Sequence, residues 1–128
     1  MFKLSERSKK RLGGVDPRLV EVVEEAIEIT KIDFGIPEYG GLRTAEDQMY
    51  LFQTGRSKAD GVEKKSNHQS GKAFDVYAYV EGEASWEEGH LAMVAAAVLQ
   101  AANKLGYKVS WGGLWKNFKD MPHFQIED

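Results

Sequence analysis

The sequence predicts an α+β domain in which helices pack on one face of a small mixed or antiparallel sheet. Segments with helical spacing and segments rich in β-prone residues follow one another without the repeating βαβ period of a parallel sheet. The chain has 128 residues, 42% of them hydrophobic, a size suited to one packed core. It has no cysteine, so no disulfide stabilises the fold and no thiolate can bind a metal ion. We therefore expect one domain over residues 1–128.

The distribution of charged and apolar residues argues against two kinds of partner. The net charge is −3, and the one basic cluster, residues 9–11, is too short for a nucleic-acid-binding face. The longest apolar run, residues 91–99, is too short to span a bilayer, and residues 1–6 lack the apolar core of a signal peptide. We expect a monomer that binds no nucleic acid, does not insert into membranes and is cytoplasmic in the producing cell.

The N-terminal third is predicted to hold one main helix and one strand. Residues 1–14 are polar and basic and indicate an arm or a short helix. Asp16 followed by Pro17 is typical of a helix start, and apolar residues then recur at helical spacing over residues 17–30. The glycines and proline of residues 33–41 favour a short edge strand that ends in a turn.

The middle of the chain is predicted to hold a second helix and a loop. Thr44, with Asp47 three residues later, approximates a capping box for a helix over residues 45–54. Gly55 is a natural residue after its end. Residues 56–65 are charged and lack periodicity, which indicates a surface loop.

The next segments predict a strand and a long helix. Residues 73–80 are continuous and β-prone, so we expect one strand there. Ser85 and Glu88 have the spacing of a capping box, and apolar residues at helical spacing follow until Gly106. The chain then predicts a strand over residues 107–111, a glycine turn, an irregular stretch and a last strand over about 122–127.

Two of the three histidines belong to a candidate metal site. His68 and Asp75 are seven positions apart, and His123 comes from the distant last strand. Two imidazoles and one carboxylate form the ligand set of a catalytic zinc site, whose open position holds a water with a pKa near about 7. No H-E-x-x-H motif is present. On spacing alone, a set of ordinary hydrogen-bonded residues is the alternative.

Hydrolysis at such a site also needs a general base and a donor to the oxyanion. Asp120, three residues before His123, is the leading candidate for the base. Arg43 is the candidate for the oxyanion or for a substrate carboxylate. The alternatives are that Asp120 caps a turn and that Arg43 pairs with Glu46 or Asp47.

Two further side chain types have both a structural and a functional interpretation. His90 is interpreted as structural, at an exposed position of the long helix. Trp111 and Trp115 stand beside glycines and are typical of a core, although the rim of a cleft is the other interpretation. We take Trp111 as a candidate substrate-binding residue.

Several motifs together resemble the zinc D-alanyl-D-alanine carboxypeptidase (VanY-like) family. These are Gly41-Leu42-Arg43-Thr44 with Gln48 and Gly55, the pattern S-x-H-x-x-G-x-A-x-D over residues 66–75, Trp111-Gly112-Gly113, and Asp120-Met121-Pro122-His123-Phe124. The match is nearest to the L-alanyl-D-glutamate endopeptidase branch, which includes many phage endolysins. It extends over nearly the whole chain, and the motifs occur in the same order.

The resemblance implies roles for individual residues. His68, Asp75 and His123 match the ligands of one Zn²⁺, and Asp120 matches the acidic catalytic residue, which is Glu in many relatives. Arg43 matches an arginine near the scissile carbonyl. The resemblance also implies that Ser66 lines the substrate pocket, and that the fold is the one shared with lysostaphin-type peptidases and hedgehog proteins.

The implied function is bacteriolytic: zinc-dependent hydrolysis of a peptidoglycan stem peptide, at the L-Ala–D-Glu bond. Such endolysins accumulate inside the cell and act on the cell wall after release. A D-Ala-D-Ala carboxypeptidase or dipeptidase is one alternative, and a non-catalytic, hedgehog-like module stabilised by metal is another. The acidic residue at Asp120 argues against the second alternative.

Overall fold

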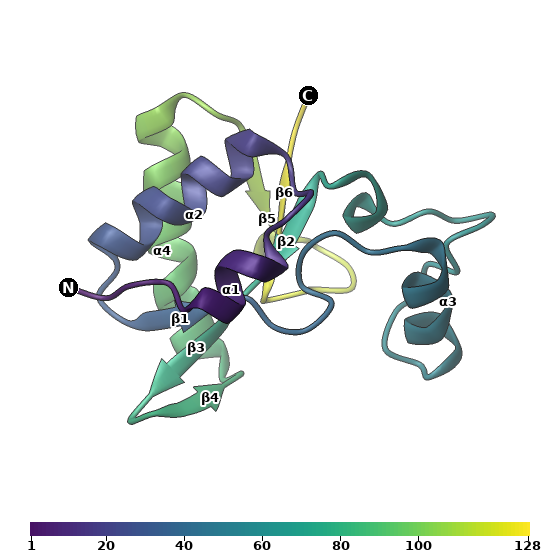
Figure 1. Cartoon of the computed structure of the whole chain (residues 1–128), viewed down its shortest axis with the longest axis horizontal. Coiled ribbons are helices and arrows are strands. Elements are labelled where there is room, and N and C mark those ends of the chain that lie inside the picture. The colour runs from purple at the N-terminus through teal and green to yellow at the C-terminus, as the bar shows by residue number, and fades with distance from the viewer.

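The computed structural model describes residues 1–128 and has helices arranged around two small sheets (Figure 1). One sheet has the strand order β1-β3-β4 and the other β2-β6-β5, and all four strand pairs are antiparallel. The elements are α1 (Glu6–Arg11), α2 (Pro17–Ile29), β1 (Asp33–Gly35), α3 (Ala45–Gln53), β2 (Ala73–Asp75), β3 (Tyr77–Val80), β4 (Glu83–Ser85), α4 (Glu88–Leu105), β5 (Val109–Trp111) and β6 (His123–Ile126), with 3₁₀ turns η1 (Asn67–Ser70) and η2 (Gly112–Leu114). The predicted α+β class is confirmed, with two sheets in place of one.

The core lies between the α2–α4 helix pair and the strands. Asp16 accepts a hydrogen bond from the Arg18 backbone N–H and Pro17 occupies the first turn, as their order in the sequence predicts. Gly106 ends α4 in a left-handed conformation with φ of 80°. Packing of α2 against α4 buries the apolar faces of both helices (Figure 1).

The predicted strand over residues 73–80 is two strands in different sheets. β2 pairs with β6 and β3 pairs with β1 and β4, and the change occurs at Val76. There the backbone N–H donates to the carbonyl of Pro122 at 3.0 Å, outside both ladders. Phe74, Val76 and Ala78 are all fully buried. A continuous apolar run is compatible with one strand or two, because periodicity does not mark the break.

The predicted capping box at the start of the long helix is wrong. α4 begins at Glu88 with Glu87 as the N-cap residue, and no side chain caps it. Ser85 is instead the last residue of β4, opposite Ala78 of β3, and its hydroxyl contacts His90 Nδ1 at 2.6 Å. Strand pairing therefore takes precedence over the local capping signal, and His90 has a structural contact.

Helix α1 packs against the core, whereas helix α3 lies apart from the sheets. α1 is part of the domain rather than a free arm: Leu4 and Leu12 reach the core, and the buried Ser8 hydroxyl accepts from the Ile36 N–H at 2.9 Å. α3 and the loop after it lie to one side of both sheets (Figure 1).

None of the helices has both the length and the apolar character needed to cross a lipid bilayer.

Candidate metal centre and substrate cleft

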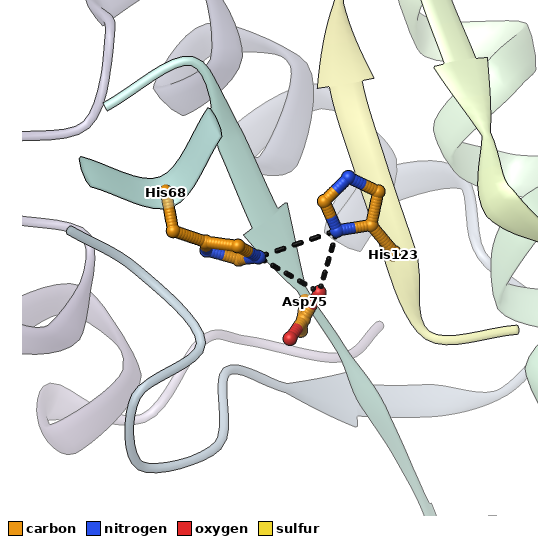
Figure 2. Close-up of side chains that lie close together, drawn as sticks. All are labelled: His68, Asp75 and His123. Carbon is orange, nitrogen blue, oxygen red and sulfur yellow. Dashed lines mark hydrogen bonds and ion pairs between the residues drawn. The ribbon is translucent and has the colours of Figure 1, made fainter. Parts of the chain in front are cut away.

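Three ligand atoms from separate elements meet at one point (Figure 2). His68 comes from η1, Asp75 is the last residue of β2, and His123 is the first residue of β6. His68 Nε2 lies 3.2 Å from His123 Nδ1 and 3.3 Å from Asp75 Oδ1, and His123 Nδ1 lies 3.2 Å from the same oxygen. Both imidazoles are buried. The predicted set of His68, Asp75 and His123 is thus brought together.

The other ring nitrogen of each histidine fixes its tautomer. His68 Nδ1 lies 2.9 Å from the carbonyl oxygen of Gly41, which only accepts, so this nitrogen carries the proton. His123 Nε2 donates to Gln125 Oε1 at 2.8 Å. The orientation of that amide follows from Glu127, whose carboxylate accepts from Gln125 Nε2 at 3.1 Å. The nitrogens left to bind a metal ion are therefore His68 Nε2 and His123 Nδ1, which lie beside each other and beside a carboxylate oxygen.

This donor set fits a tetrahedral zinc ion. Zinc bonds to nitrogen and carboxylate oxygen of about 2.0–2.1 Å place neighbouring ligand atoms about 3.3–3.4 Å apart at the corners of a tetrahedron. The three separations here are 3.2, 3.2 and 3.3 Å. Three lone pairs at such distances repel one another unless a metal ion or a proton lies between them. The group can hold a metal ion and leaves a fourth position open.

The sequence around each ligand explains its position. Asp75 and His123 are direct partners in the β2–β6 ladder. Ser66 caps η1 by accepting from the His68 N–H at 3.1 Å, and Gln69 completes the capping box. Gly71 ends η1 with φ of 73°, and a β-carbon there would lie 2.6 Å from the Gly14 carbonyl oxygen. Glycine is therefore required at this turn.

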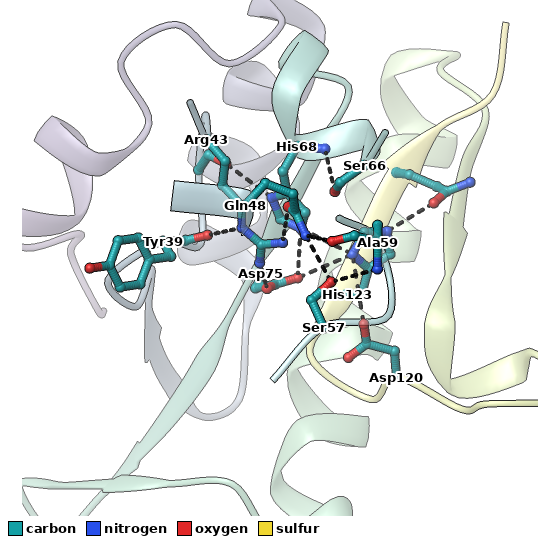
Figure 3. Close-up of polar contacts among 12 residues, drawn as sticks. Tyr39, Arg43, Gln48, Ser57, Ala59, Ser66, His68, Asp75, Asp120 and His123 are labelled. Atoms are coloured by element: carbon teal, nitrogen blue, oxygen red, sulfur yellow. Dashed lines mark hydrogen bonds and ion pairs between the residues drawn. The ribbon is translucent and has the colours of Figure 1, made fainter. Parts of the chain in front are cut away.

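The Arg43 side chain is largely buried and forms hydrogen bonds within the site (Figure 3). Its Nε donates to the Tyr39 carbonyl at 2.8 Å, Nη1 to Gln48 Oε1 at 3.1 Å and Nη2 to Asp75 Oδ2 at 3.2 Å. The alternative of a pair with Glu46 or Asp47 is absent from the structure. Asp75 is therefore held by arginine through one oxygen and faces the histidines through the other.

The segment before Arg43 holds both N-terminal ligands. The Gly40 carbonyl accepts from the Asp75 N–H at 2.7 Å, and the Arg43 N–H donates to the His68 carbonyl at 3.0 Å. Gly41 lies so close to α1 that a β-carbon would be 1.9 Å from the Arg11 carbonyl oxygen. The Gly-Gly pair of the sequence motif is therefore explained by a close approach of backbones.

Asp120 lies beside the ligands without joining them. Its Oδ2 is 4.0 Å from His123 Nδ1, and its side chain is 47% exposed. Gly112 accepts from the Asp120 N–H at 3.1 Å, and a β-carbon on Gly112 would lie 2.3 Å from the Asp120 carbonyl oxygen. The glycine after Trp111 thus allows the approach that places Asp120 at the cleft.

The two carboxyl groups are in opposite electrostatic environments. Burial alone raises the pKa of Asp75, but without a metal ion the charge and N–H groups of protonated His68 and His123 outweigh burial and hold the pKa of this carboxyl well below its usual range. Burial and the neighbouring Asp75 carboxylate raise the pKa of Asp120. Asp75 is therefore a permanent anion, and Asp120 is the group suited to exchange a proton.

The ligands lie at the bottom of an open cleft of about 640 Å³. Six predicted site residues line it: Arg43, Ser66, His68, Asp75, Asp120 and His123. Trp111 does not line this cleft, because its ring stacks on Phe124 and its N–H donates to the Met121 carbonyl at 2.6 Å. The tryptophan of the cleft is Trp115, whose ring lies 5.2 Å from that of His123.

Sequence reasoning assigned no role to three side chains at the site. Gln125 orients His123, Gln48 binds Arg43, and Phe118 lines the cleft. Gln125 follows His123 by two residues on the same strand, a spacing that places both on one face. The alternation of faces along a strand could therefore have identified Gln125 as a neighbour of His123.

A group of two imidazoles and one carboxylate that could hold a metal ion, beside a half-exposed acid and an open cleft, is typical of one class of protein, the metal-dependent hydrolases. A family model described as phage L-alanyl-D-glutamate peptidase matches residues 1–126. The chain belongs to this family. Its membership makes the protein a peptidase rather than a non-catalytic module.

Individual relatives agree with the family. The L-alanyl-D-glutamate peptidase of Escherichia phage T5 is 32% identical over 115 residues, which cover 89% of this chain and 82% of the phage protein. The crystal structure of the Serratia marcescens L-Ala D-Glu endopeptidase ChiX matches with a TM-score of 0.85 at 38% identity, over 98% of this chain and 90% of that one. The LdcB LD-carboxypeptidase shares the fold, with a TM-score of 0.55 at 20% identity over 94% of this chain and 68% of that one.

Proposed function

We propose that the protein hydrolyses the L-Ala–D-Glu bond of the peptidoglycan stem peptide, using one Zn²⁺ held by His68 Nε2, Asp75 Oδ1 and His123 Nδ1. The observation that carries the proposal is the convergence of these three lone-pair atoms, with Asp120 half-exposed beside them. Family membership supports the choice of bond. A zinc ion there would acidify water and polarise the scissile carbonyl.

The side chains of the cleft supply the other steps. Asp120 accepts the proton of the attacking water and later donates it to the amino group of D-Glu, a role that suits its raised pKa. Arg43 has five N–H donors, and three are used by Tyr39, Gln48 and Asp75. The remaining two stabilise the negative charge on the carbonyl oxygen or bind a substrate carboxylate. Ser66 holds the His68 backbone and lines the substrate pocket.

The proposal includes the organisation and location of the protein. Residues 1–128 form one catalytic domain that acts as a monomer and needs no nucleic acid. The protein is made in the cytoplasm and acts on the cell wall after release, as the resemblance to phage endolysins implies.

Zinc analysis of two histidine variants and digestion of purified peptidoglycan test this proposal. We expect about one equivalent of zinc in the wild type and its loss, with loss of activity, in His123→Ala. His90→Ala is the matched control, because the His90 ring contacts Ser85 and Glu87 away from the cleft. Mass spectrometry of the products should show new D-Glu amino termini. Full zinc content and activity in His123→Ala, or release of free D-alanine alone, would contradict the proposal.

A further inference from the structure

One wall of the cleft beside the metal centre is strongly basic. Arg56, Lys58 and Lys64 come from the loop after α3, and Lys119 comes from the segment before β6. All four side chains belong to exposed residues that line the cleft. The only acidic residues of the same cleft are Asp75 and Asp120, which have roles at the metal centre. The basic wall therefore has charge available for a ligand.

These four cations are not neutralised by the protein itself. None of them forms an ion pair, whereas Lys72 binds Asp16 at 3.0 Å and Lys104 binds Glu25 at 3.0 Å on other faces. The molecule as a whole has a net charge of −3. A concentration of unpaired positive charge along one cleft of an acidic protein favours anionic ligands at that place.

The two segments that carry the basic wall contact each other. Lys58 Nζ lies 4.3 Å from the centre of the Phe118 ring, a distance typical of a cation–π contact. Phe118 itself has a positive φ of 53°, so the backbone turns sharply where it meets the loop. The contact holds the loop after α3 against the segment that leads to Asp120, and thereby places the lysines beside the metal centre.

The other side of Asp75 has a different character. A second hollow of about 340 Å³ shares Arg43, Arg56 and Asp75 with the first. Its remaining lining residues contain no lysine and include two aromatic rings: Pro37, Glu38, Tyr39, Leu51 and Trp86. The lysines are therefore confined to the first hollow and the aromatic rings of Tyr39 and Trp86 to the second, while Arg56, which lies 5.9 Å from the centre of the Tyr39 ring, stands between them.

The proposed substrate has the same polarity. On the amino side of the L-Ala–D-Glu bond, L-alanine is joined to a sugar by an amide and carries no charge. On the carboxyl side, D-glutamate keeps its α-carboxylate because the chain continues through its γ-carboxyl group. The third residue adds another carboxylate when it is diaminopimelate. The negative charges of the stem peptide thus all follow the bond to be cut.

We propose, resting on the function proposed above, that the basic wall of Arg56, Lys58, Lys64 and Lys119 binds the carboxylates that follow the scissile bond. The cleft then accepts the stem peptide in one direction, with the sugar toward Tyr39 and Trp86. It also selects stem peptides with free carboxylates over those in which these groups are amidated. Carboxamides have the same shape but no charge, so they lose the attraction to the lysines.

Three disaccharide tetrapeptides with diaminopimelate at position three test this inference. The first has free carboxylates, the second is amidated on the α-carboxyl of D-Glu, and the third on the side-chain carboxyl of diaminopimelate. We expect wild-type kcat/KM to be higher for the first than for at least one amidated form, by up to about fivefold, the scale of a partly exposed ion pair. Added salt should reduce this preference.

Charge-removing variants identify the residues responsible. Lys64→Gln and Lys119→Gln should lower the preference toward one by reducing kcat/KM on the free form only. Lys31→Gln is the control, since Lys31 is exposed and lies outside the cleft. Equal rates on all three peptides, or a preference that no lysine variant changes, would overturn the inference while leaving the cleavage itself intact. Absence of cleavage at L-Ala–D-Glu in every peptide would instead overturn the proposed function.

Discussion

Gln125 is expected to control zinc affinity through His123, although it does not touch the metal position. Its Oε1 accepts the His123 Nε2 proton at 2.8 Å, and its Nε2 is in turn held by Glu127 at 3.1 Å. The bond keeps the proton on Nε2 and leaves the Nδ1 lone pair for the metal. Gln125→Leu keeps a similar volume but removes the acceptor. The imidazole can then rotate or take the wrong tautomer.

The size of the effect follows from the burial of His123. Leaving one buried polar group without its partner costs about 1–3 kcal/mol. Since each 1.4 kcal/mol is about tenfold in an equilibrium constant, zinc binding should weaken by about 5- to 150-fold. This range contains the roughly 10- to 100-fold losses typical of residues that orient metal ligands.

Competition for zinc with a chromophoric chelator measures this change directly at fixed pH. Gln53→Leu is the matched control, because Gln53 is an exposed residue at the end of α3. Thermal unfolding of the metal-free variants should show that both remain folded. An unchanged zinc Kd in folded Gln125→Leu would refute the reasoning that the Gln125–His123 bond orients the ligand.

Four other variants test the proposed base, the arginine of the site and the core. Asp120→Asn should retain zinc and lose about 10²-fold or more in turnover. The kcat/KM of the wild type should fall as the pH decreases through the raised pKa of Asp120, and the kcat/KM of the variant should not show this fall. Arg43→Ala should lower kcat by about 10²-fold or more, Arg43→Lys should recover part of it, and normal kinetics with zinc bound would remove Arg43 from the mechanism. Phe74→Ala should lower stability by about 3–5 kcal/mol and the Tm by about 10–20 °C in calorimetry, because Phe74 is fully buried and stacks on Phe124 at 5.2 Å; a shift of only a few degrees would contradict this packing.

The ligand residues could be predicted from sequence mainly because the motifs around them resemble those of a known peptidase family, since their spacing alone left ordinary hydrogen-bonded residues as the alternative. Histidine and aspartate inside or beside β-prone runs need a partner when buried, and a metal ion satisfies all three at once. The partner of Arg43 could not be predicted in this way. Glu46 and Asp47 are closer to Arg43 in sequence than Asp75 is. Only the passage of β2 over the Gly40–Gly41 turn brings Asp75 Oδ2 to 3.2 Å from Arg43 Nη2.

The fold differs from expectation where local and long-range interactions compete. Residues 73–80 gave no sign of a break, because the change of sheet at Val76 depends on the Pro122 carbonyl from the other end of the chain. Trp111 and Trp115 have similar sequence neighbourhoods. Their roles separate only because the Trp111 N–H finds the Met121 carbonyl, which fixes that indole on the core.

Because Asp75 lies directly opposite His123, metal binding at the candidate site would depend on the register of β2 against β6. If β6 shifted by one residue along β2, His123 would turn to the other face of the sheet, and Phe124 would take its place opposite Asp75. An ion that binds only the native alignment stabilises that alignment over every shifted one. Zinc would then favour the correct pairing of β2 with β6 during folding, in addition to its proposed part in catalysis.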